Sequence, residues 1–491
     1  MNKSNYLAFD IGASSGRAIL GTLEKGRVTL QEVYRFSNEM CFLDEHYHWD
    51  IYKLFDELKQ GLKKCIHEFK IVPDSIAIDT WGVDFGLLDS EDKLLGLPFA
   101  YRDSITDGSM EEVFSIIEPS ELYRMTGIQF MKFNSLFQLW ALKQQYSEML
   151  GKATKLLFMP DLLGFMFTGK FWSEQTIAST SQIIDPASKE WLDGLMNKLG
   201  LPFNILQELV PPGSIPGSLT PAIQGELGCP AIPVVASCAH DTAAAIVSIP
   251  ASGEDWVYIS SGTWSLMGME LTKPVLNKAA FSSSFTNEGG FAGTTRFLKN
   301  ITGLWLLQEC KKIWDKAHDY SFSELVELSL KAMPFRSLID PDSDEFMNPG
   351  DMVKAITDYC IKSGQPEPAN PGEYSRCIFE SLALKYRYTL EQLLKANPAN
   401  PSVVHIIGGG TYNELLCQYT ANATGLRVIA GPAEGAALGN ILVQAYASGK
   451  VNGADEIRQV VKKSVRTKEY HPEDQSLWAR AYEKWTKIIF V

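Results

Sequence analysis

Near the start of the chain, Asp10 and Arg17 flank a turn of small residues and have charged side chains that suit ligand binding. The turn contains Gly12, Ser14, Ser15 and Gly16. Backbone N–H groups, serine hydroxyls and a guanidinium donate to phosphate oxygens, and a carboxylate can bind Mg²⁺. The segment therefore favours a nucleotide-phosphate site, although an ordinary tight hairpin with a structural aspartate would use the same residues. It is not a P-loop, because no Lys-Ser or Lys-Thr pair follows the glycines.

The same order of features occurs again in the second half of the chain. Apolar residues 6–9 and 18–20 predict two strands around the first turn, so that turn is a hairpin loop. Residues 256–259 predict another strand, 260–263 form a Ser/Gly turn, and 264–268 alternate as a returning strand. Two such hairpins indicate two related lobes, each offering a phosphate-binding turn to a cleft between them.

A candidate reactive acid follows a predicted buried strand at 232–236. His240 and Asp241 lie beyond its end, and 242–246 begin a helix. In open α/β sheets, ligands bind beyond the carboxyl ends of strands. Taken alone, Asp241 reads as a helix N-cap and His240 as a packing residue. If the hairpins hold phosphates, Asp241 has the chemistry of a proton acceptor in phosphoryl transfer.

A run of three glycines, Gly408 to Gly410, follows a predicted parallel strand at 403–407 and precedes a helix from about Asn413. Such a turn lets an adenine or ribose lie against the backbone, or it is simply a tight strand-to-helix connection. Two polar islands, at 287–290 and 299–300, face either a sugar or solvent.

Other segments supply the framework that must position these residues. An apolar stripe predicts a core-facing helix over 51–69, and 76–85 reads as strand, turn and strand. The Pro/Gly-rich stretch 211–221 is expected to be a loop. Residues 248–255 are expected to connect the two lobes.

Composition excludes several classes of protein. A chain of 491 residues with 45% hydrophobic residues is globular and large enough for two or more domains. The formal net charge of −13 argues against a nucleic-acid partner. We expect no membrane span and no secretory signal, hence a cytoplasmic protein. Eight cysteines without a Cys-x-x-Cys pair are expected to be reduced thiols.

The chain resembles the FGGY carbohydrate kinases from about Tyr6 to Ala445. The segments that carry the resemblance, in order, are 10–17, 79–85, 100–103, 240–242, 260–268 and 298–301. The resemblance implies an α/β fold of two ribonuclease-H-like, actin-like ATPase lobes with an interlobe ATP and sugar cleft. The expected domains are 1–247 and 256–447, with a helical tail, 448–491, packed on the lobes.

The resemblance also assigns roles to individual residues. ATP contacts fall on Ala13, Ser14, Ser15, Gly16, Arg17, Thr263, Gln308, Gly409 and Gly410. Sugar contacts fall on Gly82, His240, Asp241, Thr242 and Asn300, with Asp241 as the catalytic proton acceptor. Mg²⁺ would bridge the phosphates with Asp10 as its nearest protein neighbour. The spacing leaves open which glycine of 408–410 contacts the nucleotide.

The closest resemblance within the family includes the Asp-Thr-Trp-Gly segment at 79–82, where many other members carry a Gln-Arg-containing polyol motif, so glycerol is not the expected substrate. The resemblance therefore implies ATP-dependent phosphorylation of the 1-hydroxyl of L-rhamnulose, an open-chain 6-deoxy-L-ketohexose. L-Fuculose, or both ketoses, is the alternative, because the two sugars differ only at C4. An actin-like ATP-dependent conformational switch is the alternative outside the sugar kinases. The protein is expected to be a monomer or a homodimer.

Overall fold

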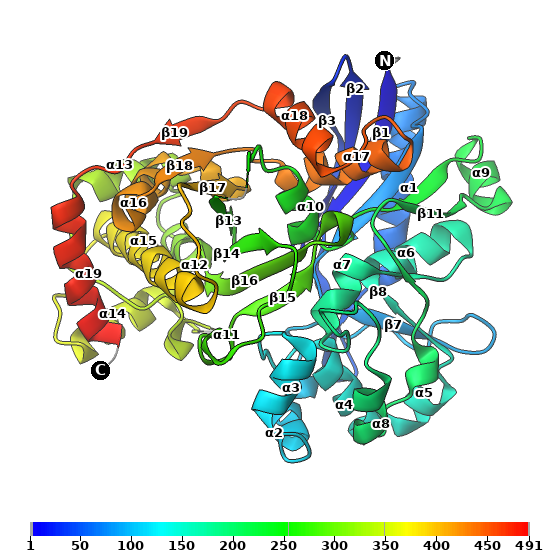
Figure 1. Cartoon of the computed structure of the whole chain (residues 1–491), viewed down its shortest axis with the longest axis horizontal. Coiled ribbons are helices and arrows are strands. Elements are labelled where there is room, and N and C mark those ends of the chain that lie inside the picture. The colour runs from blue at the N-terminus through cyan, green and yellow to red at the C-terminus, as the bar shows by residue number, and fades with distance from the viewer. Residues whose placement is uncertain (1–2, 254, 348, 490–491) are drawn as a thin grey trace. The chain divides into compact units, whose positions relative to one another are not determined.

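The computed structural model describes residues 3–253, 255–347 and 349–489, which fall into two units. Unit 1 contains the chain up to Pro250 together with Glu270–Phe297 and Gly435–Val465. Unit 2 contains Ala251–Met269, Leu298–Glu434 and the chain from Arg466. Figure 1 labels most of the helices and strands of both units.

Most strands and helices of unit 1 precede Pro250. The strands are β1 (Ser4–Ile11), β2 (Ser15–Glu24), β3 (Arg27–Ser37), β4 (Met40–Leu43), β5 (His46–Trp49), β6 (Ser75–Thr80), β7 (Phe85–Leu88), β8 (Lys155–Phe158), β9 (Ser173–Glu174), β10 (Leu209–Val210), β11 (Ser214–Ser218), β12 (Pro233–Ala236) and β15 (Thr286–Gly289). The helices are α1 (Ile51–His67), α2 (Ser109–Phe114), α3 (Pro119–Thr126), α4 (Ser135–Gln145), α5 (Ser147–Lys152), α6 (Met159–Thr168), α7 (Gln175–Ala178), α8 (Asp193–Leu199), α9 (Pro221–Leu227), α10 (Asp241–Val247), α11 (Lys278–Ser282), α17 (Gly435–Ala447) and α18 (Ala454–Ser464).

Unit 2 holds the elements of the second half. They are β13 (Trp256–Ser261), α12 (Trp305–Trp314), α13 (Phe322–Lys331), α14 (Met352–Lys362), α15 (Pro371–Ala396), β17 (Val403–Ile407), α16 (Glu414–Thr424), β18 (Arg427–Ala430), β19 (Lys468–Tyr470) and α19 (Gln475–Ile489). The unit boundary divides β14 (Trp264–Leu271) and β16 (Thr295–Thr302).

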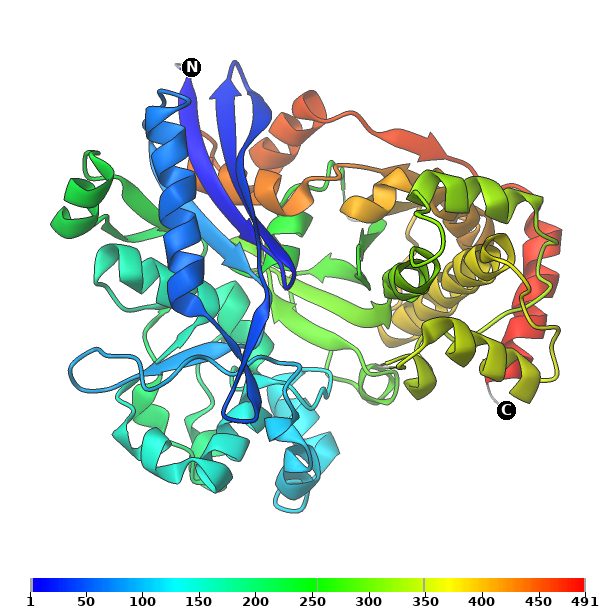
Figure 2. The same cartoon turned by 180° about the vertical axis from the view of Figure 1, so that it is seen from behind.

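The central sheet of unit 1 has the strand order β11-β12-β6-β1-β2-β3. β1 pairs antiparallel with β2 and parallel with β6, and β12 is parallel to β6. The predicted first hairpin is therefore confirmed. α1 runs along the β1–β3 part of this sheet (Figure 2) and buries the predicted apolar stripe. α10 and α17 pack together and contact β6 and β1, so this sheet is covered by helices.

Close packing of α17 depends on residues without a side chain. A Cβ on Gly21 of β2 would lie 2.5 Å from Ile441, and a Cβ on Gly439 would lie 1.8 Å from the Ala244 carbonyl oxygen. Larger residues at either position would push the helix away from the sheet or from α10. Through this close packing, α17 becomes part of unit 1 although it lies near the far end of the sequence.

The sheet that contains the second hairpin repeats the arrangement of the first. Its order is β15-β16-β14-β13-β17-β18-β19. β13 pairs antiparallel with β14 and parallel with β17, and β18 is parallel to β17. In both sheets the first strand of the hairpin pairs with one parallel strand, that strand pairs with a second parallel strand, and an antiparallel edge strand follows. The predictions of a second hairpin and of a parallel strand at 403–407 are confirmed.

Two predictions about local structure need correction. The expected loop at 211–221 contains β11, a short edge strand paired with β12 through an irregular register. Pro216 and Gly217 are tolerated there because an edge strand needs fewer backbone hydrogen bonds. The strands at 75–80 and 85–88 do form, but they do not pair with each other, since β7 pairs with β8. No helix among the described residues is long and apolar enough to cross a membrane.

Candidate active site

The first hairpin turn joins Asp10, near the end of β1, to Arg17 of β2. Arg17 Nη2 donates to Asp10 Oδ2 over 2.5 Å, so the predicted metal ligand and the predicted phosphate cation are paired with each other. The Gly12 N–H donates to the Ser15 carbonyl over 2.9 Å and closes the turn. Asn38 holds the turn from outside through its backbone and side-chain N–H groups. The Gly12 N–H is thus used within the loop itself.

The remaining predicted phosphate residues lie in or directly after this turn. Ala13 and Ser14 form the turn, and Ser15 and Gly16 begin β2. A Cβ on Gly16 would lie 2.1 Å from the ring of Phe36. Close packing against β3 therefore accounts for this glycine, whether or not a phosphate approaches it.

A second acid lies beside Asp10. Asp79 of β6 occupies the register position opposite Asp10 of β1, and its side chain is fully buried. Asn440 of α17 donates to Asp79 Oδ2 over 2.6 Å. Burial, followed by the charge of Asp10, raises the pKa of Asp79 well above its ordinary value. The two carboxyl groups therefore favour a single negative charge over two.

Two of the predicted sugar-site segments, 79–85 and 240–242, meet in unit 1. Beyond the end of β12, His240 forms a parallel bridge with Thr80, and the Thr80 N–H donates to the Ala239 carbonyl over 2.9 Å. Gly82 lies two residues beyond Thr80 in the sequence. A Cβ on Gly82 would lie 3.1 Å from Thr180, so the glycine allows a close approach.

Asp241 has one oxygen held and one oxygen open. Oδ1 accepts hydrogen bonds from the backbone N–H and the hydroxyl of Thr242, and His240 Nε2 lies 3.4 Å from it. Oδ2 has no hydrogen-bond partner among the residues that the structure describes. The side chain is 33% exposed, whereas that of His240 is 11% exposed. A carboxylate with one anchored and one accessible oxygen is suited to accept a proton.

Glu174 fixes the backbone on which His240 lies. This fully buried carboxylate accepts hydrogen bonds from the Ala239 N–H and from the backbone N–H and hydroxyl of Thr176. Burial raises the pKa of Glu174 to about 7. The residue was not identified from the sequence, because only the fold brings β9 to the 239–242 segment.

Sequence reasoning also missed Arg296. It is fully buried, and its Nη2 donates to Glu288 Oε2 over 2.8 Å and lies 3.0 Å from His240 Nδ1. Glu288 belongs to the polar island at 287–290, which is therefore partly turned toward the His240 segment. A lone arginine between Thr295 and Phe297 gives no signal in the sequence that could have identified it.

The predicted nucleotide residues of unit 2 form two contacts. Thr263 Oγ1 donates to Gln308 Oε1 over 3.3 Å, which joins the second hairpin turn to α12. Gly410 packs against Ser261 of the same hairpin so closely that a Cβ would lie 2.0 Å from its hydroxyl. Gly409 has open space where its Cβ would be. Thr263, Gln308 and the glycine turn thus gather around one hairpin, while the predicted sugar residue Asn300 lies on β16 in unit 2.

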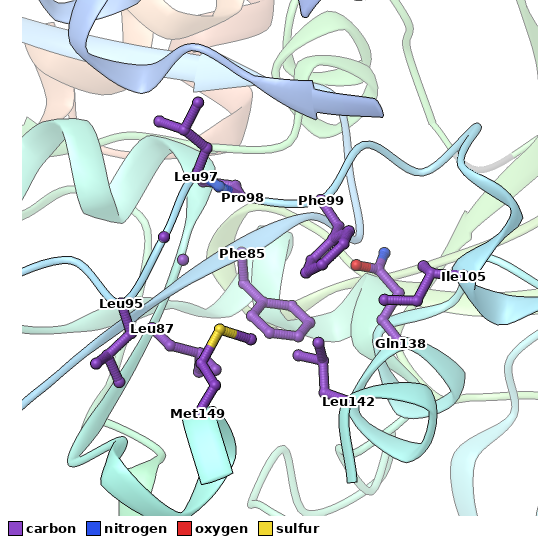
Figure 3. A pocket seen from close by; sticks show the side chains of 12 residues that line it. Phe85, Leu87, Leu95, Leu97, Pro98, Phe99, Ile105, Gln138, Leu142 and Met149 are labelled. Atoms are coloured by element: carbon purple, nitrogen blue, oxygen red, sulfur yellow. The ribbon is translucent and has the colours of Figure 1, made fainter. Parts of the chain in front are cut away.

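The structure also contains an apolar pocket apart from these residues. It is lined by Phe85, Gly86, Leu87, Leu95, Gly96, Leu97, Pro98, Phe99, Ile105, Gln138, Leu142 and Met149 (Figure 3). None of the predicted site residues lines it. Gln138 is its polar side chain, and that amide already donates to Asp84 and to a backbone carbonyl. The pocket therefore lacks the groups for phosphoryl transfer.

Two family models match the chain. The N-terminal domain of the FGGY family of carbohydrate kinases matches residues 5–248, and the C-terminal domain of that family matches residues 257–448.

Relatives of similar length match this sequence over nearly its full length. A rhamnulokinase of Bacteroides thetaiotaomicron is 46% identical over 480 residues, covering 98% of both chains. A rhamnulokinase of Oceanobacillus iheyensis is 42% identical over 93% of this chain and 96% of its own. A rhamnulokinase of Enterococcus faecalis is 40% identical over 99% of this chain and 98% of its own.

Solved structures share the fold at low sequence identity. A gluconate kinase of Lactobacillus acidophilus superposes with a TM-score of 0.83 at 15% identity, covering 99% of this chain and 98% of its own. A xylulose kinase of the same organism gives 0.82 at 15% identity over 99% and 97%. The predicted fold class is thereby confirmed.

Proposed function

Because the chain belongs to the FGGY family of carbohydrate kinases, we propose that it transfers the γ-phosphoryl group of ATP to the 1-hydroxyl of L-rhamnulose. The products are L-rhamnulose 1-phosphate and ADP. The observation that carries this proposal is the similarity to proteins named rhamnulokinase, at 46% identity over 98% of both chains. The arrangement of Asp241, with one held and one accessible oxygen, supports the same reaction.

Asp241 Oδ2 accepts the proton of the 1-hydroxyl while the oxygen of this hydroxyl bonds to the γ-phosphorus. The bond from this phosphorus to the bridging oxygen of ATP breaks, and ADP leaves with the electron pair. Gly82, His240, Thr242 and Asn300 bind and orient the ketose in this scheme. Thr242 keeps Asp241 Oδ1 occupied, so the carboxylate presents Oδ2 to the sugar.

ATP is held by backbone and side-chain donors. In this scheme its phosphates contact the turn from Ala13 to Arg17, and Thr263 lies by the γ-phosphate. Gln308, Gly409 and Gly410 contribute to the rest of the nucleotide site. An incoming phosphate would compete with Asp10 for the Arg17 guanidinium. When the ion pair between Asp10 and Arg17 breaks, the Asp10 carboxylate becomes free.

The residues present are compatible with Mg²⁺. No group of three or more His, Cys, Asp or Glu side chains within the described ranges is arranged to hold a metal ion. Mg²⁺ in kinases is usually held by one or two carboxylates together with substrate phosphates, and Asp10 supplies such an oxygen ligand. When bound, the ion would neutralise charge on the phosphates during transfer.

The test is sugar-dependent ADP release by the purified protein with ATP and Mg²⁺. L-Rhamnulose, L-fuculose, both xylulose enantiomers and glycerol are compared with a control that lacks sugar. A kcat/KM for L-rhamnulose at least about tenfold above every other sugar supports the proposal. Equal or faster turnover of L-fuculose would replace the substrate, and ADP release independent of sugar would indicate a conformational ATPase instead.

A further inference from the structure

Arg296 is a buried cation whose donors are shared between His240 and its surroundings. It lies on β16 with no exposed surface. Its Nε donates to the Gly289 carbonyl over 2.8 Å, and the two hydrogens of Nη2 face Glu288 Oε2 and His240 Nδ1. Burial tends to raise the pKa of Glu288, but the Arg296 charge is the largest of the opposing causes, and the pKa is held below its ordinary value. Glu288 is therefore ionised and keeps Arg296 in place.

The hydrogen bonds determine which nitrogen of His240 carries the proton. A guanidinium has donors only, so His240 Nδ1 must accept at the 3.0 Å contact with Arg296 Nη2. Glu288 Oε2 lies farther from the same Nδ1, at 3.4 Å, and would be a partner only if Nδ1 carried a hydrogen. The shorter contact therefore favours a neutral imidazole with its hydrogen on Nε2.

His240 Nε2 faces the reactive acid. It lies 3.4 Å from Asp241 Oδ1, within reach of a hydrogen bond that can shorten when a substrate binds. Oδ1 is the oxygen that accepts the two Thr242 hydrogen bonds, so a hydrogen bond from Nε2 would strengthen the hold on the same oxygen. The opposite tautomer would place a lone pair against the carboxylate and repel it.

We infer that Arg296 is a positioning residue for the transfer step: it fixes His240 in the Nε2–H tautomer, and this N–H orients Asp241 so that Oδ2 meets the sugar hydroxyl. The inference rests on the proposed function for the role of Asp241. Arg296 does not touch the reacting atoms. It acts through His240, so its effect should appear in kcat more than in the KM for ATP.

A purely structural role explains Arg296 less well. Arg296 Nη1 is buried without a hydrogen-bond partner in the described part of the chain, which is costly for a charged group. Well-packed apolar residues often replace a buried ion pair without loss of stability. The effect of Arg296 on His240 better explains why the buried Arg296–Glu288 pair lies beside a reactive acid despite the cost of the unpartnered Nη1.

The direct test reads the tautomer of His240 without any turnover. The chain has seven histidines, so in ¹⁵N-histidine-labelled protein the His240 signals are those missing from His240→Gln. We expect the Nε2–H form in the wild type and a loss of that form in Arg296→Met. Because this change leaves the Glu288 carboxylate buried without its cation, Arg296→Met/Glu288→Leu carries the same test if the single variant does not fold.

The kinetic test uses a double-mutant cycle with His240→Gln. Glutamine at 240 places an amide donor near the position of Nε2, and this donor does not depend on Arg296. We expect Arg296→Met to lower kcat about tenfold or more in the wild type, with the KM for ATP within about twofold. In the His240→Gln background the same change should alter kcat by no more than about twofold.

Arg376→Met is the matched control, because Arg376 also forms a buried pair, with its Nε 2.7 Å from Glu380 Oε1. It should lower the thermal midpoint and leave the His240 tautomer and kcat unchanged. The inference is overturned if Arg296→Met keeps the Nε2–H form, or if it lowers kcat equally in both backgrounds. A wild type inactive on L-rhamnulose counts against the proposed function instead, and the tautomer measurement still decides the role of Arg296.

Discussion

Asp10 and Asp79 lie opposite each other on the parallel strands β1 and β6, and of the two it is Asp10 that forms an ion pair within the described ranges. Asp10 pairs with Arg17, whereas Asp79 is buried and accepts a hydrogen bond from Asn440. Two carboxyl groups that are register partners on adjacent strands thus have different surroundings. Desolvation and the nearby Asp10 charge raise the pKa of Asp79, whereas Asp10 lies in an ion pair with Arg17.

This difference gives opposite expectations for two conservative variants. Asp79→Asn replaces a carboxyl group that already favours its neutral form, and its side-chain oxygen can still accept from Asn440. We expect the free energy of unfolding to change by less than about 1 kcal/mol. Asp10→Asn removes the carboxylate charge, and we expect kcat/KM to fall at least about 100-fold. Thermal melts and initial rates of both variants provide the measurement. A larger loss of kcat/KM in Asp79→Asn than in Asp10→Asn would contradict this account.

The same acid predicts the response to Mg²⁺. Removing the metal with a chelator should abolish sugar-dependent ADP release, and adding Mg²⁺ back should restore it. In Asp10→Asn the Mg²⁺ concentration needed for half-maximal rate should rise, because one oxygen ligand is lost. An unchanged Mg²⁺ dependence in this variant would remove Asp10 from the metal site.

The glycine turn offers a matched pair of variants. A Cβ on Gly410 would lie 2.0 Å from the Ser261 hydroxyl, whereas a Cβ on Gly409 meets no atom within 4 Å. Gly410→Ala should lower the free energy of unfolding by about 1–3 kcal/mol, because Ser261 and its hairpin must shift. Gly409→Ala should keep the thermal midpoint of the wild type and raise the KM for ATP. Equal melting of the two variants would show that the packing of Gly410 against Ser261 does not matter for stability.

Glu174 should make stability depend on pH. Its pKa is about 7 in the folded protein and lies near 4.5 in the unfolded chain. A raised pKa in an acid means that the stabilising contribution is complete below about pH 4.5 and is lost as the pH rises through about 7. Relative to Glu174→Gln, which stays neutral, the wild type should lose about 3 kcal/mol over that range.

Thermal midpoints of both proteins from pH 4.5 to 8.5 provide the measurement. The difference between them should shift in favour of Glu174→Gln as the pH rises. A difference that stays constant across the range would contradict the raised pKa of Glu174.

The sequence predicted the parts of the fold that depend on local pattern. Alternation and small-residue turns identified the two hairpins, and an apolar stripe identified α1. β11 was missed because Pro216 and Gly217 resemble a loop in sequence, and only pairing with β12 makes this stretch a strand. Local signals cannot reveal which partner strand is available.

The candidate site was predictable where a motif marked it and not where the fold assembled it. Asp241 begins α10 shortly after β12, and its place between a predicted strand and a predicted helix identified it as a candidate. Glu174 reaches the Ala239 N–H across 65 positions of sequence and Arg296 reaches His240 across 56, and neither residue belongs to a motif. Long-range placement of such buried charges depends on the packing of the whole unit.

The most direct test of the central claim compares ATP binding with phosphoryl transfer to L-rhamnulose in Asp241→Asn. Asparagine preserves the shape of the side chain but cannot accept the proton of the 1-hydroxyl. We expect the Kd for ATP to stay within about twofold of the wild type and kcat to fall at least about 100-fold. Turnover near that of the wild type would contradict the role of Asp241 as proton acceptor.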